Sequence, residues 1–329
     1  MQSKQIRFMS MVVTLIALCL LLSVPALAKG QGGVKGKGPK PVGAVNSSNG
    51  GVYARGQYGI VGKYIYLHAD DYYHGDDKVD YKRPKPGKKG KKVKEKTLNK
   101  YQLTLRTGVF DNFDARLVIP LLDKELKRES ARKSFTDDNV GIGDIKLIGR
   151  YRVMSQKKKD PLNLAIGLGL EMPTGDTDKQ DSNGKHPGWI QTGWGSWNPI
   201  FEVGVHKVMG RHWISTHVMY KMSTEGDRGS KDFEGPDVFK YNAAYVFATC
   251  NWFDVGLELN GEFKTKAKLS GVTLQKTGGH TVFITPEVHF KLYKGLHFDI
   301  GVPITVYRDL NGEQLSEDYR VVTKLAYKF

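Results

Sequence analysis

Charged side chains recur at every second position in several otherwise apolar segments of this 329-residue chain. Successive side chains of a β-strand point to opposite faces, so such charges share one face of each strand. The basic set, on segments 98–110, 113–122, 142–153 and 318–329, consists of Arg106, Arg116, Lys146, Arg150, Arg152, Arg320 and Lys324. The acidic set, on segments 162–172, 195–206, 252–264, 280–291 and 295–307, consists of Glu171, Glu202, Asp254, Glu258, Glu262, Glu287 and Asp299. Two opposed walls of this kind would either orient water and polar solutes or pair across a narrow interior.

Other groups of reactive side chains give weaker evidence for a chemical function. Ser215 and His217 stand two apart on one face of a predicted strand. An outer-membrane lipase would need a nucleophile facing the bilayer with a base in hydrogen-bond reach, and no G-x-S-x-G motif occurs. Asp176, Asp178 and Asp181 crowd one loop, but their spacing does not match a calcium-binding loop. We therefore expect no catalytic residue, no metal site and no cofactor.

Twelve segments of the chain have apolar residues at every second position, and these segments carry the charged side chains. In one of them Leu164, Ile166 and Leu168 alternate with Ala165 and Gly167. The predicted strands cover residues 56–68, 98–110, 113–122, 142–153, 162–172, 195–206, 211–223, 236–249, 252–264, 280–291, 295–307 and 318–329. Long and short connections alternate along the chain, which places the long loops at one end of the sheet.

A soluble sandwich or barrel would also alternate, because one face of each strand would point into a core. An export signal, an even strand count, strand lengths of about ten residues and loops segregated by length instead favour an outer-membrane barrel. Charges in mid-strand would be hard to satisfy inside a soluble barrel. The sequence therefore predicts an all-β fold, a transmembrane antiparallel up-and-down barrel of about twelve strands with its apolar rows facing lipid.

The first residues of the chain have the organisation of a secretory signal peptide. Lys4 and Arg7 precede an apolar run that ends at Ala26-Leu27-Ala28, so we expect cleavage after Ala28. Residues 29–51 contain eight glycines and four lysines and are predicted to be a flexible leader, with the barrel over 52–329. The mature chain then holds one cysteine, Cys250, which excludes a disulfide framework.

The chain ends on an alternating strand that places Tyr327 and Phe329 on its outer face. An aromatic C-terminal residue resembles the assembly signal of bacterial outer-membrane proteins and implies recognition by the barrel-assembly machinery. Both ends of such a barrel lie in the periplasm, so the long loops are expected outside the cell.

Two glycine-rich stretches, Gly141-Ile-Gly-Asp-Ile-Lys-Leu-Ile-Gly-Arg-Tyr151 and Gly167-Leu-Gly-Leu-Glu-Met-Pro-Thr-Gly-Asp176, resemble a large family of outer-membrane transporters. That family is named for the meta-pathway of phenol degradation. The resemblance implies a barrel with a role in the uptake of small, often aromatic, compounds. A turn motif required for folding explains these residues equally well.

Residues 82–96 carry nine positive charges and one negative charge, with no aromatic residue, and are predicted to form a disordered extracellular loop. Lipopolysaccharide is the nearest anionic surface that this loop would meet. Without the signal peptide, the leader and this loop, the formal charge falls from +16 to +2. The barrel itself is then nearly neutral, and the basic segment has no aromatic residue on which a base could stack. Both features argue against nucleic-acid binding.

The sequence thus favours a channel of the cell outer membrane for passive uptake of small polar or aromatic molecules. Its partners would be membrane lipid, lipopolysaccharide and the permeant itself. A non-conducting structural or adhesive barrel that acts through its loops is the alternative, and a lipase is a distant third.

Overall fold

The computed structural model describes residues 39–86, 91–181, 184 and 187–329. The predicted signal peptide, 1–28, and the first part of the predicted leader, 29–38, lie outside the described residues. Within the described part of the chain, no helix combines the length and apolarity needed to cross a membrane.

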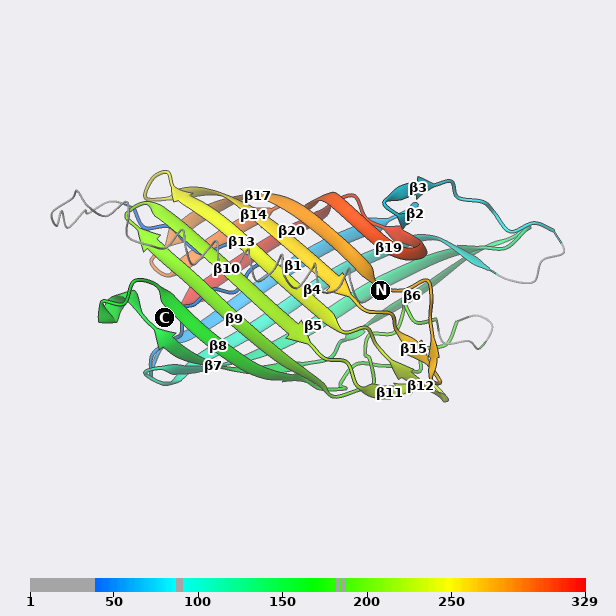
Figure 1. The fold of residues 1–329 in the computed structure, drawn as a ribbon, viewed down its shortest axis with the longest axis horizontal. Helices are drawn as coiled ribbons and strands as arrows, with labels where there is room; N and C mark the ends of the chain where they lie inside the picture. Colours follow the sequence, from blue (N-terminus) through cyan, green and yellow to red (C-terminus); the bar gives the residue numbers. More distant parts are fainter. Residues whose placement is uncertain (1–38, 87–90, 182–183, 185–186) are drawn as a thin grey trace, which may run out of the picture.

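The fold is a closed antiparallel barrel of twelve strands, as predicted. Each strand pairs with its neighbours in chain order, and the last strand pairs with the first to close the wall. The strands are β1 (Tyr58–Ala69), β4 (Lys92–Phe110), β5 (Phe113–Glu129), β7 (Lys146–Met154), β8 (Asn163–Glu171), β9 (Asn198–Met209), β10 (His212–Lys221), β13 (Val238–Ala248), β14 (Phe253–Lys264), β17 (Gly279–Tyr293), the pair β18 (Leu296–Gly301) and β19 (Ile304–Ser316), and β20 (Arg320–Lys328). Figure 1 shows them crossing the long axis obliquely.

Two strands of the barrel wall are interrupted: the predicted strand 142–153 is β7, preceded by a separate strand β6 (Ser134–Ile142), and the predicted strand 295–307 is divided into β18 and β19. β6 and β7 both pair with β5 and are separated by residues 143–145. β18 and β19 are separated by Val302 and Pro303 and both pair with β17. Proline cannot donate to the ladder, which explains the second interruption.

Solvent exposure follows the predicted alternation. In β8, Ile166 is 47% and Leu168 is 65% exposed, whereas the alternate residues Ala165 and Gly167 are buried. The outer positions of the other strands carry exposed apolar side chains in the same way, among them Leu105, Leu147, Phe201, Leu257 and Leu325. A continuous apolar outer surface of this size is stable only against lipid.

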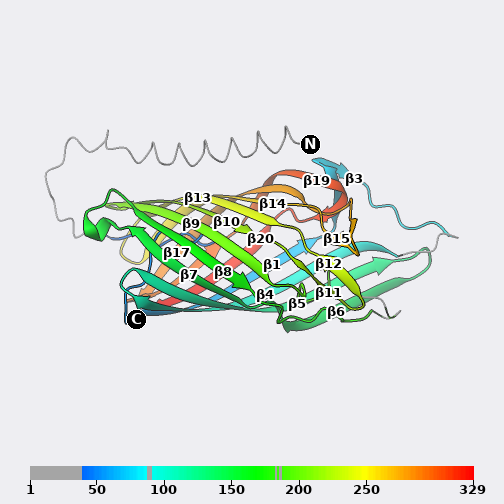
Figure 2. The same ribbon diagram turned by 60° about the horizontal axis from the view of Figure 1, so that its bottom comes forward.

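The two ends of the barrel differ as the loop lengths predicted. Short connections at 111–112, 155–162, 210–211, 249–252 and 294–295 lie at the end that carries the C-terminus; the second of them contains the 3₁₀ turn η2 (Gln156–Lys158). At the other end, β2 (Asp71–Gly75) and β3 (Asp77–Val79) form a hairpin, and two loops contribute a four-stranded sheet. That sheet consists of β11 (Glu225–Arg228), β12 (Lys231–Glu234), β15 (Lys268–Leu269) and β16 (Val272–Thr273). Figure 2 shows these elements gathered at that end.

The predicted basic loop is partly a strand. Residues 92–96 belong to β4, which pairs with an equally extended β5 well beyond the predicted boundary at 122. Cross-strand contacts neutralise part of the charge: Lys127 lies 2.8 Å from Glu95, and Lys94 lies 3.7 Å from Glu129. The prediction of disorder over 82–96 is therefore wrong for its last five residues, because acids on β5 supply partners that the local composition does not reveal.

Candidate functional site: the barrel lumen

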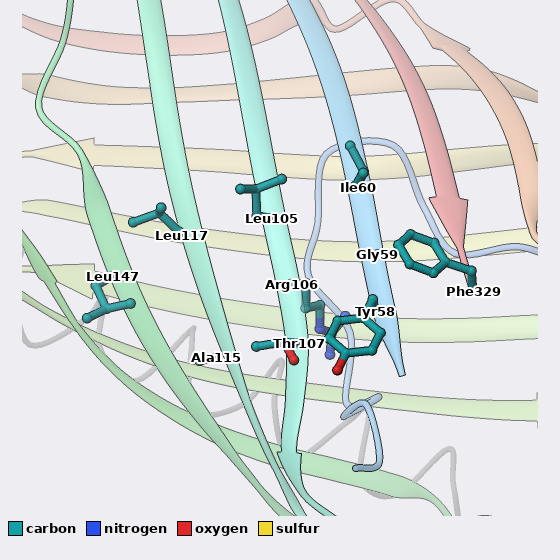
Figure 3. Close-up of a pocket in the computed structure, with 10 residues that line it drawn as sticks. All are labelled: Tyr58, Gly59, Ile60, Leu105, Arg106, Thr107, Ala115, Leu117, Leu147 and Phe329. Carbon is teal, nitrogen blue, oxygen red and sulfur yellow. The ribbon is translucent and has the colours of Figure 1, made fainter. Parts of the chain in front are cut away.

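The lumen contains an uncharged stretch of the chain, residues 42–53, that precedes β1. This segment enters near the short-turn end, bends within the barrel and returns to the same end, where Tyr58 begins β1. Figure 3 shows the blue chain before β1 looping behind the strands. We call residues 42–53 the lumenal segment. It includes the end of the stretch predicted to be a flexible leader, and it is held by hydrogen bonds to both charged walls.

Acidic residues hold the amide groups of the lumenal segment. Val42 N donates to Asp254 at 2.9 Å, and Asn46 N donates to Glu258 at 3.0 Å. Val45 N donates to Glu287 at 2.8 Å. All three carboxylates are almost completely buried. Each therefore receives a charge-assisted hydrogen bond from a peptide group. Asp254 is also paired with Lys291, whose ammonium group lies 2.5 Å from its other carboxylate oxygen.

Basic residues hold the carbonyl groups. Arg150 donates to Gly51 O at 2.8 Å and also to Asn49 O. Arg106 donates to Gly51 O at 2.5 Å, and Lys324 donates to Ala44 O at 3.0 Å. Arg116 bonds Ser48 Oγ at 2.8 Å, and Arg152 bonds Val52 O. The peptide dipoles of one uncharged segment thus satisfy charges of opposite sign on opposite sides of the lumen.

The remaining carboxylates of the acidic set pair directly with members of the basic set. Glu202 contacts Arg116 and Arg150, the latter at 2.9 Å. Glu171 lies 2.7 Å from Lys146, and Asp299 lies 2.7 Å from Lys324. Glu262 lies 2.9 Å from Arg320. These ion pairs join the acidic set to the basic set inside the barrel.

The lumenal segment is the functional element that the sequence analysis missed. One signal was present: residues 41–54 carry no charge, although four lysines precede them within 29–40. An uncharged stretch beside a strongly charged strand pattern is suited to a polar interior, because its amides bind ions of either sign.

The seventh predicted strand, now β10, does not assemble a hydrolytic site. Ser215 faces the lumen, and its Oγ has no hydrogen-bond partner among the described residues. His217 Nε2 lies 3.6 Å from Glu202, and His206 stacks on Trp213 with 4.2 Å between the ring centroids. No base therefore reaches the Ser215 hydroxyl in this arrangement.

Loops fold over the opposite end of the lumen. In the loop after β8, residues 172–181 and 187–197 turn inward, and Asp144 accepts the N–H groups of Gly175 at 3.0 Å and Trp194 at 2.7 Å. The Arg228 guanidinium lies 3.2 Å from the centroid of the Phe233 ring, which stacks on Trp194. Burial beneath these loops lowers the pKa of Arg228 to about 10, so it remains a cation at neutral pH.

An apolar hollow of about 400 Å³ lies on the outer wall, not in the lumen. Tyr58, Ile60, Leu105, Leu147 and Phe329 line it, and all five are exposed. Tyr58 and Phe329 stack with 5.8 Å between their centroids, and Figure 3 shows them side by side where β1 meets β20. The hollow is part of the lipid-facing surface.

The closed wall, the apolar exterior and the charged interior define an outer-membrane β-barrel. Residues 90–313 match the family described as "Putative MetA-pathway of phenol degradation", and the chain belongs to that family, as its motifs predicted. A crystal structure of an outer membrane channel from Pseudomonas putida F1 is similar in fold, with a TM-score of 0.67 at 14% identity; the alignment covers 87% of this chain and 100% of that one. The toluene transporter TodX of P. putida is more distant, with a TM-score of 0.42 at 7% identity over 83% of this chain and 90% of that one. A sequence search of curated proteins gave no match.

Proposed function

We propose that this protein is a channel of the outer membrane for passive uptake of small polar or aromatic molecules, and that it performs no enzymatic step. The observation that carries the proposal is a lumen lined along its length by charged side chains inside an apolar outer wall. The family to which the chain belongs supports it. So does the fold shared with the outer membrane channel of Pseudomonas putida F1.

Single-channel recording in planar bilayers tests the proposal. The purified full-length protein should give discrete conductance steps that are smaller than those of a wide porin, because twelve strands enclose a narrower interior than sixteen and the lumenal segment occupies part of it. Heat-denatured protein at the same concentration is the control. Complete absence of steps would contradict the channel.

The second candidate is a non-conducting barrel that acts through its loops. Its specific support is the lumenal segment, since a segment held at both walls could close the lumen. A barrel of this kind would show no conductance in the native protein and none after the segment is displaced.

We further propose that the chain is exported with cleavage after Ala28 and assembled through its aromatic C-terminus. Phe329 exchanges backbone hydrogen bonds with Tyr58 at 2.9 and 3.0 Å and stacks on Tyr327. Deletion of Phe329 should therefore reduce the amount of folded protein in the outer membrane several-fold, measured by heat-modifiable mobility on gels. Deletion of the loop residue Gly184, where an added Cβ would meet no atom within 4 Å, is the control. Equal yields from both deletions would refute this role.

The basic segment 82–96 is proposed to bind the phosphate groups of lipopolysaccharide. Its described residues include Lys91 and Lys92, whose ammonium groups lie over the rings of Phe135 and Tyr72 at 3.6 and 4.5 Å. Replacing the six cations from Lys82 to Lys91 with serine should weaken binding to lipopolysaccharide vesicles, and the loss should shrink at high salt because exposed charges are screened. Unchanged binding would exclude the segment.

A further inference from the structure

Four lysines form a strip on the inner face of three neighbouring strands, nearer the loops than the lumenal segment. They are Lys63 on β1, Lys96 and Lys100 on β4, and Lys124 on β5. Lys63 pairs in register with Gln102, two residues from Lys100. Lys124 pairs with Leu98, midway between Lys96 and Lys100. Register alone therefore brings four ammonium groups onto one patch of the lumen wall.

This lysine strip lacks the partners that neutralise the other lumenal charges. In the part of the chain that the structure describes, no carboxylate lies within 4.0 Å of any of the four ammonium groups. Lys63 donates to Val45 O at 3.2 Å, and Lys124 donates to Gln191 O at 2.5 Å. Among the same residues, Lys96 and Lys100 have no oxygen acceptor. The amino groups of these two lumenal lysines are thus left for solvent or solute.

Other lysines act on Lys100. They are Lys63, Lys146 and Lys240, of which Lys146 is paired with Glu171 at 2.7 Å and Lys240 with Glu262 at 2.9 Å. Positive charge without a carboxylate partner raises the barrier for cations and lowers it for anions.

An aromatic ring borders the strip. The Trp189 ring, on the inward-folded residues 187–197, lies 5.0 Å from Lys96 Nζ and 5.6 Å from Lys124 Nζ. The indole N–H of Trp189 is buried and has no acceptor among the described residues. The amino groups of Lys96 and Lys100 and the indole N–H make a set of donors without an oxygen acceptor, and the Trp189 ring already contacts one of them, Lys96.

We propose that the lysine strip and Trp189 form an anion-selective site whose substrate class is small aromatic carboxylates. The inference rests on the proposed channel and names its permeant. The carboxylate would be bound by Lys96 and Lys100, and the aromatic ring of the solute would pack on Trp189. The site lies on the loop side of the lumenal segment, so an entering solute would meet it first.

Ion selectivity tests the charge of the site. In a gradient of potassium chloride, the full-length protein should prefer chloride to potassium. Each lysine of the strip is expected to contribute about threefold to that permeability ratio, from the Coulomb attraction of one charge across a few ångströms of water. The double variant Lys96→Met, Lys100→Met should therefore lower the ratio by about tenfold. The double variant Lys157→Met, Lys158→Met removes the same charge from an exposed turn and should change the ratio little.

Equilibrium binding tests the class of solute and does not need conductance. Calorimetry on the folded full-length protein should detect benzoate binding, with acetate and benzyl alcohol binding more weakly by several-fold. Trp189→Leu should reduce benzoate binding without reducing chloride preference. Cation preference in the native protein would overturn the inference, as would equal binding of all three solutes. A third outcome separates the two proposals. If the protein shows no conductance but binds benzoate, and the double variant Lys96→Met, Lys100→Met abolishes that binding, the channel is refuted and the binding site is retained.

Discussion

Substitution of Gly50 by alanine is expected to raise single-channel conductance several-fold in the otherwise unchanged full-length protein. A Cβ at Gly50 would lie closer than 3.0 Å to two backbone oxygens of the barrel wall, those of Asn163 and Gly204. Both oxygens belong to strands β8 and β9, which cannot retreat without breaking the barrel ladder. The lumenal segment must therefore leave its position, and the cross-section that it fills becomes available to ions.

The matched control is Gly62→Ala on β1, where a Cβ would meet no atom within 4 Å. Both variants add one methyl group, but that of Gly62→Ala lies on the lipid-facing row beside Leu103 and Leu325, so a difference between them reports contact with the lumenal segment and not a general effect of alanine. Exposure of the segment can be followed independently, because displaced residues 42–53 should be cleaved faster by a nonspecific protease. Native conductance in Gly50→Ala, together with native protease resistance, would show that the segment tolerates the added atom.

The barrel was predictable because period two is a local property. Each strand was recognised from its own residues, such as Ile166 and Leu168 on one face of β8, and closure followed from the strand count. The ends of the strands were less predictable. β4 begins at Lys92 and β5 ends at Glu129, because the charged residues of these extensions pair across the two strands. The lysine-rich composition of 82–96, taken alone, predicts a loop.

The lumenal residues were predictable by position but not by contact. Alternation places Arg150 and Glu202 inside the barrel, yet nothing in their local sequence shows that they meet each other across it. The hydrogen bonds of Val45 N to Glu287 and of Lys324 to Ala44 O join residues more than 200 positions apart. Such contacts depend on barrel closure and on the path of an irregular segment. Because an irregular segment has no repeating hydrophobic pattern, its path could not be predicted from the sequence.

An uncharged segment suits this lumen for a physical reason. A buried ion needs compensation, and a peptide group offers a donor and an acceptor at a smaller cost of desolvation than a second ion. The segment can also leave without carrying charge out of the membrane interior. The walls that remain would then hold unpaired ions in a wider, hydrated passage, where water supplies the missing hydrogen bonds. A removable closure is therefore compatible with a stable barrel.

Replacing Glu202 by glutamine should destabilise the folded barrel by about 3–5 kcal/mol, the cost of leaving a buried charge without its partner. Glu202 is 5% exposed and neutralises Arg116 and Arg150, and Arg150 is only 1% exposed. Urea unfolding in lipid vesicles, followed by tryptophan fluorescence, measures the change. Glu225→Gln is the control, because Glu225 is exposed and forms no ion pair within the described residues. The double variant Glu202→Gln, Arg116→Met should recover part of the loss, since it removes one of the two stranded cations. Equal stability of Glu202→Gln and Glu225→Gln would mean that water in the lumen already screens these charges, and the same screening would weaken the hold of the walls on the lumenal segment.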